Sequence, residues 1–187
     1  MKKAVLILVI VSAFSGCKYY SETLTFNDNM TSGKIEILVS YDVAEARKNN
    51  IDRPTTDSLK TKLSQFKGII VSSSTVDYSS EYNRDYINAE FTFDSEKAFN
   101  ALEKGKDGIR AVGSMFVDFN LDDWTIEYHR TIQLDPHDEG DYAVVFPKDL
   151  YVVDTNAQDV DDDMVSWYFK VGDDPLETEM YLILAEK

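Results

Sequence analysis

The sequence predicts an α+β fold: a largely antiparallel sheet with two helices on one face, in a ferredoxin-like order with extra strands, and a β-rich C-terminal part. Apolar and polar residues alternate along most of the chain, as they do in strands with one buried face. Two segments, 54–68 and 94–105, instead begin with polar capping residues and end at a glycine, which is typical of helices. The 10 Phe, 11 Tyr and 2 Trp among 187 residues supply enough apolar surface for a core.

The first elements form a predicted hairpin. Residues 20–26 alternate, with Glu22, Leu24 and Phe26 on one side, and residues 35–41 alternate strictly. The segment between them, 27–33, is rich in Asn, Asp, Ser and Gly, the residues that favour turns. A short helical turn is expected near 43–48.

The helices and later strands follow in order. One helix is expected after Pro54 and ends before Gly68, and a second begins at Asp94 or Ser95 and runs through Lys104. Further strands are predicted at 69–78, 86–94, 115–119, 124–128, 142–146, 150–153, 165–171 and 179–184.

Trp167 is expected in the core. It alternates with Val165, Phe169 and Val171 on one side of its strand, while polar residues and a tyrosine lie on the other. The alternative is an exposed stacking platform for a sugar or lipid.

The N-terminus reads as an export signal. Met1–Lys3 is basic, Ala4–Phe14 is apolar except for one serine, and the small residues Ser15 and Gly16 follow. An apolar helix of eleven residues is too short to cross a hydrocarbon core of about 30 Å. Phe14–Cys17 resembles the bacterial lipobox, and this resemblance implies cleavage between Gly16 and Cys17 and a lipid on the Cys17 thiol. The alternative is an ordinary signal with an incidental cysteine.

These observations predict three segments: a lipoprotein signal peptide (1–16), an anchor segment with the first strand of the hairpin (17–33), and a single α+β domain (34–187). A separate C-terminal subdomain is the alternative. We expect an exported protein anchored to the bacterial membrane by acyl chains such as palmitate, and to the outer membrane in a Gram-negative host.

The charge of the chain is strongly negative and uneven. The net charge is −15, so an anionic nucleic acid is excluded as an expected partner. Residues 17–110 hold 13 basic and 15 acidic side chains, whereas residues 111–187 hold 4 and 19. Either the second half carries a solvated acidic surface or it docks a basic partner or cations. The acidic run 154–163 lacks the spacing of an EF-hand loop, and no metal site is predicted.

Recognisable catalytic motifs are absent from the sequence. His129 and His137 are expected to be exposed and without a catalytic role, and the sole thiol is assigned to lipidation. No Gly-x-Ser-x-Gly, His-Glu-x-x-His, Gly-x-Gly-x-x-Gly or P-loop occurs. No catalytic residue and no cofactor is therefore predicted.

The C-terminal half resembles the LppM-type bacterial lipoprotein domains. A strand closing on Pro147, a valine-rich strand at 150–153, then Asn156 and Val165-Ser-Trp167 carry the likeness, and Phe91-Thr-Phe-Asp-Ser95 leading into a helix fits the same order. The resemblance implies an exported, membrane-tethered domain and supplies no catalytic set.

We therefore expect a lipid-anchored envelope module that binds a protein partner or an amphiphile and is not an enzyme. A hydrolytic or carbohydrate-active lipoprotein that uses carboxylates, for example those at 122–123 or 173–174, is the alternative.

Overall fold

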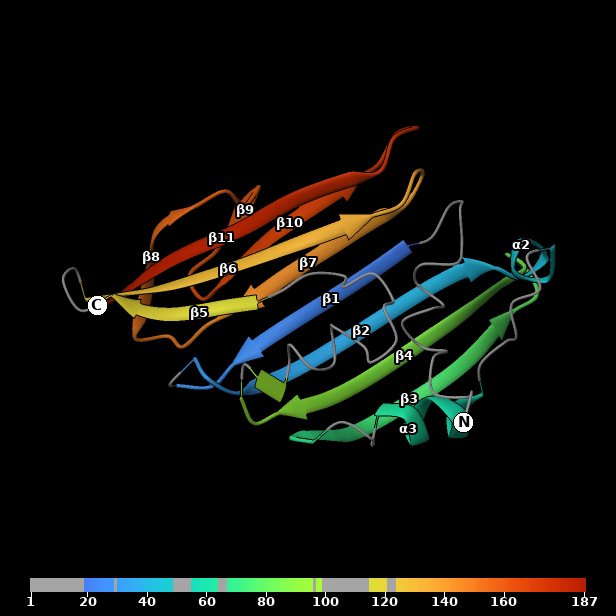
Figure 1. The fold of residues 1–187 in the computed structure, drawn as a ribbon, viewed down its shortest axis with the longest axis horizontal. Coiled ribbons are helices and arrows are strands. Elements are labelled where there is room, and N and C mark those ends of the chain that lie inside the picture. Colours follow the sequence, from blue (N-terminus) through green and yellow to red (C-terminus); the bar gives the residue numbers. More distant parts are fainter. Residues whose placement is uncertain are drawn as a thin grey trace.

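The strands form two sheets, and the smaller sheet lies over one half of the larger (Figure 1). The structure, a computed structural model, describes residues 19–28, 30–48, 55–63, 67–95, 97–98, 115–120 and 124–187. The elements in chain order are β1 (Tyr19–Phe26), β2 (Gly33–Asp42), α2 (Val43–Lys48), α3 (Thr56–Leu63), β3 (Ile69–Ser79), β4 (Arg84–Phe93), β5 (Met115–Asn120), β6 (Thr125–Leu134), β7 (Glu139–Val145), β8 (Leu150–Thr155), β9 (Asp159–Val160), β10 (Met164–Lys170) and β11 (Leu176–Glu186).

The larger sheet, sheet A, has the strand order β3-β4-β2-β1-β7-β10-β9, and the smaller, sheet B, has the order β5-β6-β11-β8. Strands β1 and β7 pair in parallel, and the other strand pairs described are antiparallel. After β4 the chain alternates between the sheets: β5 and β6 lie in sheet B, β7 in sheet A, β8 in sheet B, β9 and β10 in sheet A, and β11 in sheet B.

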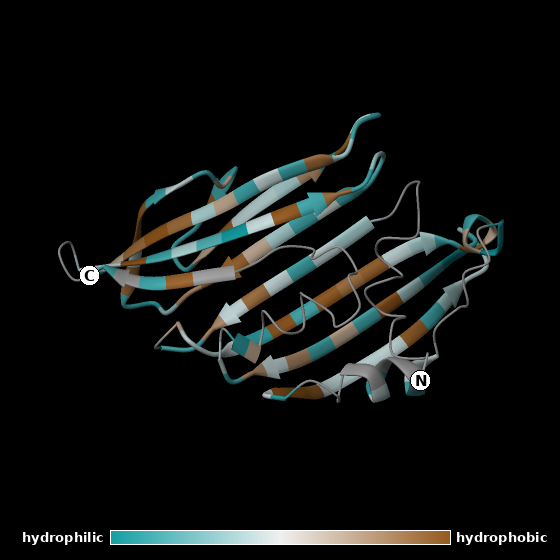
Figure 2. Ribbon diagram, in the orientation of Figure 1, coloured by the Kyte–Doolittle hydropathy of each residue, from teal (hydrophilic) through white to brown (hydrophobic). Residues whose placement is uncertain are grey.

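The core lies between the facing sides of the sheets and continues over the inner side of β2, β4 and β3. Along β1 the even-numbered residues are buried and the odd-numbered ones are half-buried, the pattern of a strand with two different faces. Figure 2 shows the same alternation of brown and teal along the other long strands. Buried residues of sheet B that face sheet A are Tyr128, Arg130, Ile132, Leu134, Met180, Leu182 and Leu184.

The predicted hairpin and strands are confirmed in outline. Strands β1 and β2 are antiparallel, α2 covers the expected helical turn, and each predicted strand segment contains a strand. Trp124, predicted as the first residue of the strand at 124–128, instead precedes β6. It has a φ of 56° and is 69% exposed.

The predicted fold class is wrong. The described chain is mainly strand, and a second sheet takes the place expected for two helices on one face. Helix α3 has eight residues and lies at the edge strand β3, where Thr56 Oγ1 accepts a hydrogen bond from the Val76 amide (3.2 Å). Of the second predicted helix, the described part is its start, where Ser95 Oγ accepts from the Ala98 amide (3.2 Å); residues 99–104 lie outside the described residues.

The acidic run 154–163 connects the two sheets. Strand β8 belongs to sheet B and β10 to sheet A, so the run carries the chain from one sheet to the other through β9. None of the helices in the described part of the chain is long and apolar enough to span a bilayer.

Candidate binding face of the large sheet

The outer face of sheet A is hollowed along its central strand. Ser21 and Thr23 project outward from β1, because their neighbours Tyr20, Glu22 and Leu24 occupy the buried face. Short side chains at the middle of a sheet leave space that longer neighbours border. Two adjoining hollows share Ser21 and Thr23, and we call them together the outer groove.

The first hollow spans β1, β2, β4 and β3 and has a volume of about 350 Å³. Its lining combines hydroxyl, amide and carboxylate groups with a few aliphatic atoms, from Ser21, Thr23, Glu36, Ile37, Leu38, Ser73, Asn88, Ala89 and Glu90. The second hollow, of about 220 Å³, lies over β1, β7 and β10, and its lining includes Asp141, Ala143, Gln158, Asp159, Ser166 and Tyr168.

Hydrogen bonds between the Gln158 side chain and the backbone of β10 hold one wall of the second hollow. Gln158 Oε1 accepts from the Tyr168 amide (3.1 Å), and Gln158 Nε2 donates to the Tyr168 carbonyl (3.2 Å). The amide side chain thus pairs with the edge of β10 much as another strand would. This fixes the segment before β9 beside Tyr168, whose side chain is 48% exposed.

Tyr19 and Asp141 border the outer groove near the start of β1. The Tyr19 hydroxyl donates a hydrogen bond to the Asp141 carboxylate. This bond, followed by burial and by the negative charge of Asp141, raises the pKa of Tyr19 above its ordinary value. Tyr19 therefore stays a neutral hydrogen-bonding group at physiological pH.

The two carboxylates of the first hollow share one lysine. Lys34 Nζ lies 3.1 Å from Glu36 Oε2 and 3.7 Å from Glu90 Oε2, and these two glutamates are directly opposite each other on β2 and β4. The hydrogen bond to Glu36 and the attraction of both carboxylates raise the pKa of Lys34. This solvated triplet keeps a net charge of −1 and suits polar recognition.

The two histidines lie away from the outer groove. His129 is on the outer face of sheet B, where Nδ1 is 3.0 Å from Glu179 Oε1 and the ring stacks on Tyr181 (6.3 Å between centroids). His137 is in the β6–β7 turn, 3.8 Å from Asp173. Neither His129 nor His137 is buried.

The predicted lipidation site lies outside the described residues. Gly16 and Cys17 precede Tyr19, the first residue of β1, at which the described residues begin. Within the described residues, no group of three or more His, Cys, Asp or Glu side chains is arranged to hold a metal ion.

The Asn and Val-x-Trp residues that carry the family resemblance meet in the fold. Trp167 is buried (2% exposed), as expected, and its Nε1 donates to Asn156 Oδ1 (2.9 Å). The same oxygen accepts from the Tyr181 amide (3.0 Å), while Asn156 Nδ2 donates to the Glu179 carbonyl (2.7 Å). Asn156 therefore joins β10 of sheet A to β11 of sheet B.

A buried ion pair between the sheets was not predicted. Arg130 of β6 holds Glu22 of β1 through two hydrogen bonds, of which Nη2 to Oε2 is 3.1 Å, and both residues are almost fully buried (1% and 2% exposed). Tyr20 donates a further hydrogen bond to Glu22, and the Arg130 guanidinium lies 5.7 Å from the centre of the Tyr142 ring. The signal in the sequence was a glutamate on the same side of its strand as Leu24 and Phe26.

Comparison with solved structures finds a similar fold. The folded domain of the Mycobacterium tuberculosis LppM protein, determined by NMR, matches with a TM-score of 0.52 at 20% sequence identity over 93% of each chain. This supports the expected LppM-like fold. No protein-family model and no curated protein sequence matches the chain.

Proposed function

We propose that the chain is a lipid-anchored, non-catalytic module of the bacterial cell envelope that binds a protein partner in the outer groove. The observation that carries this proposal is the pair of adjoining hollows on the exposed face of sheet A, lined by hydroxyl, amide and carboxylate groups. A polypeptide offers backbone and polar groups to such a lining, whereas an acyl chain would leave these groups without hydrogen bonds. A polar partner is therefore favoured over an amphiphile.

The outer groove contains serines, but neither histidine lines it, so no serine there is paired with an imidazole base. His129 and His137 lie elsewhere, and the carboxylates of the first hollow surround Lys34. A general acid or base needs a partner group within hydrogen-bond reach of the reacting atoms. These placements support a binding role over a hydrolytic one.

The groove is tested by photo-crosslinking in living cells. A photoreactive amino acid at Asn88, which is exposed in the first hollow, is compared with one at Glu177, which is exposed on sheet B. We expect a discrete protein adduct from position 88 that disappears when Thr23→Trp fills the groove and persists when Thr131→Trp is made on the outer face of sheet B. Equal adducts from both positions, or an adduct indifferent to Thr23→Trp, contradict the proposal.

The membrane anchor is tested separately. The basic start, apolar stretch and lipobox-like Phe14–Cys17 support a lipid on Cys17. Wild-type protein is expected in the detergent phase with the mass of the acyl groups, and Cys17→Ser is expected in the aqueous phase. A variant that moves the thiol, Cys17→Ser with Ser21→Cys, is the control and should also be aqueous. Detergent partitioning of all three proteins contradicts the anchor.

A further inference from the structure

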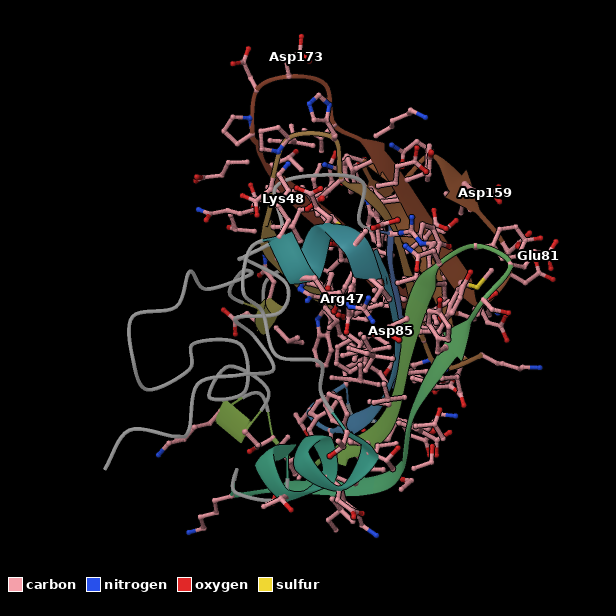
Figure 3. All side chains as sticks on the ribbon, turned by 90° about the vertical axis from the view of Figure 1, so that its right-hand side faces the viewer. Arg47, Lys48, Glu81, Asp85, Asp159 and Asp173 are labelled. Atoms are coloured by element: carbon pink, nitrogen blue, oxygen red, sulfur yellow. The ribbon has the colours of Figure 1, made fainter. Side chains whose placement is uncertain are left out.

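Several elements lie at the end of sheet A that is nearest to the proposed anchor. Tyr19, the first residue of β1, is opposite Ser40 of β2 and Glu139 of β7. Beyond this row lie α2, the β3–β4 turn (80–83), the β6–β7 turn (135–138) and the β10–β11 turn (171–175). We call this end, at the right of Figure 1 and facing the viewer in Figure 3, the tether end.

The chain between the anchor and the tether end is very short. Cys17 precedes Tyr19 by two residues, and two residues of fully extended chain span at most about 7 Å. Lipid on Cys17, which is part of the proposed function, would therefore hold Tyr19 close to the headgroups. A long linker would leave the domain free to turn, but a tether of this length does not.

We propose that the tether end lies on the surface of the lipid bilayer, with α2 and the β3–β4 turn against the headgroups. The two elements form one surface, because the Val43 amide at the start of α2 donates to the Asn83 carbonyl in the turn (3.0 Å). This surface presents Tyr82 (61% exposed) and the exposed residues Arg47, Lys48 and Glu81. Lys48 Nζ lies 3.6 Å from Glu45 Oε1 on the same helix, which leaves Arg47 as the main cation of this surface. Tyrosine rings and long basic side chains are well suited to the membrane–water interface.

The other side of the tether end is acidic. Asp173 is 98% exposed in the β10–β11 turn and Asp174 follows it, while Lys170 is already paired with Glu139 (2.6 Å). In Figure 3, Asp173 lies at the top of this end, above Arg47 and Lys48 of α2, and Glu81 of the β3–β4 turn lies at the right edge. Anionic headgroups repel the aspartates and attract the α2 cations, so the domain tilts toward α2.

The test places a fluorophore on a single introduced cysteine, since the only native thiol is occupied by lipid in the anchored protein. Glu81→Cys reports the β3–β4 turn, Asp173→Cys the acidic turn, and Lys148→Cys the β7–β8 turn at the opposite end. The full lipidated protein is bound to vesicles of phosphatidylethanolamine with a minority of phosphatidylglycerol and headgroup-labelled quencher lipid. We expect several-fold stronger quenching at position 81 than at 148, with 173 between them.

The role of the cations is tested with the pair Arg47→Glu and Lys48→Glu. This double variant should lose much of the quenching at position 81 on anionic vesicles and match the parent on neutral phosphatidylcholine vesicles. Equal quenching at 81 and 148, or a charge reversal without effect on anionic vesicles, overturns the proposed orientation. Vesicle flotation of the same samples separates the two proposals: protein that floats through Cys17 without the quenching pattern overturns the orientation alone, and protein that does not float overturns the anchor as well.

Discussion

At the scale of the residue, Asn156 and Trp167 show how polar atoms are accommodated in the core. The Trp167 ring is buried and its single N–H finds an acceptor in Asn156, so burial leaves no donor without a hydrogen bond. Asn156 also binds the backbone of β11 at two points. One short side chain therefore satisfies groups of both sheets, which explains why asparagine, rather than another small residue, stands between β8 and β9.

Replacing Trp167 should destabilise the protein strongly. Trp167→Ala removes a large buried ring and leaves a cavity, which costs about 3–5 kcal/mol in the free energy of unfolding. Denaturant unfolding followed by circular dichroism measures this loss. Trp124→Phe, at an exposed position, is the control and should change stability little. Two results together would show that the ring is not buried: a Trp167→Ala protein as stable as the wild type, and red-shifted emission from Trp167 in the Trp124→Phe single variant.

At the scale of the element, β1 organises the larger sheet. It pairs with β2 on one side and in parallel with β7 on the other, while its alternate residues contribute to the core and to the outer groove. The pairing with β2 ends at Phe26 and Gly33, where the backbones of the two strands approach closely. A Cβ on Gly33 would clash with the Thr25 carbonyl oxygen. Glycine is needed here for space, not for an unusual φ.

Substituting this glycine should loosen the first hairpin. Gly33→Ala forces the strands apart, and overpacking of this kind costs about 1–3 kcal/mol. Gly172→Ala is the matched control, because a Cβ there has no atom within 4 Å. Thermal unfolding should show a lowered Tm for Gly33→Ala and a Tm near that of the wild type for Gly172→Ala. The same Tm for both variants would contradict the close approach at Gly33.

At the scale of the whole molecule, Glu22 and Arg130 fix how the two sheets sit on each other. Their carboxylate and guanidinium meet between β1 and β6 with almost no exposure to water. A buried ion pair adds little net stability compared with apolar residues of similar size, because both charges lose their hydration. Its geometry is nevertheless demanding, so we expect the pair to select one alignment of the sheets.

Breaking and replacing this ion pair should have opposite consequences. Glu22→Gln leaves the Arg130 charge buried without its counter-charge and should cost about 3–5 kcal/mol. The double variant Glu22→Leu with Arg130→Met removes both charges and should recover most of that loss. Unfolding free energies of the single and double variants give the coupling energy between the two residues. Additive losses in the double variant would show that the two side chains are not coupled.

The fold should depend on neither a disulfide nor a metal ion. The chain has one cysteine, and the described residues hold no metal-binding group of His, Cys, Asp or Glu side chains. Thermal unfolding of the mature domain is therefore expected to be unchanged by reductant and by EDTA. A lower Tm in EDTA that returns on adding Ca²⁺ would instead indicate a calcium site in the acidic run 154–163.

The sequence by itself determined the local structure. Alternation located the strands and the inward side of β10, including Trp167, because a strand places successive side chains on opposite faces. Short segments also predicted an export signal and an LppM-like resemblance, and the fold comparison supports the resemblance. The outer groove could not be predicted from the sequence, since its residues come from seven strands and lie side by side only after these strands pair.

Only the tertiary structure decided which strands share a sheet. Backbone hydrogen bonds between strands depend little on residue type, so the sequence does not indicate which strands pair. Alternation predicts which face of a strand is buried, but it does not predict which other element covers that face. The inner face of sheet A was expected to meet two helices, and residues of β6 and β11 cover part of it instead. Glu22 on that face signalled a charged partner from elsewhere in the chain, but its identity as Arg130 follows only from the packing of β6 over β1.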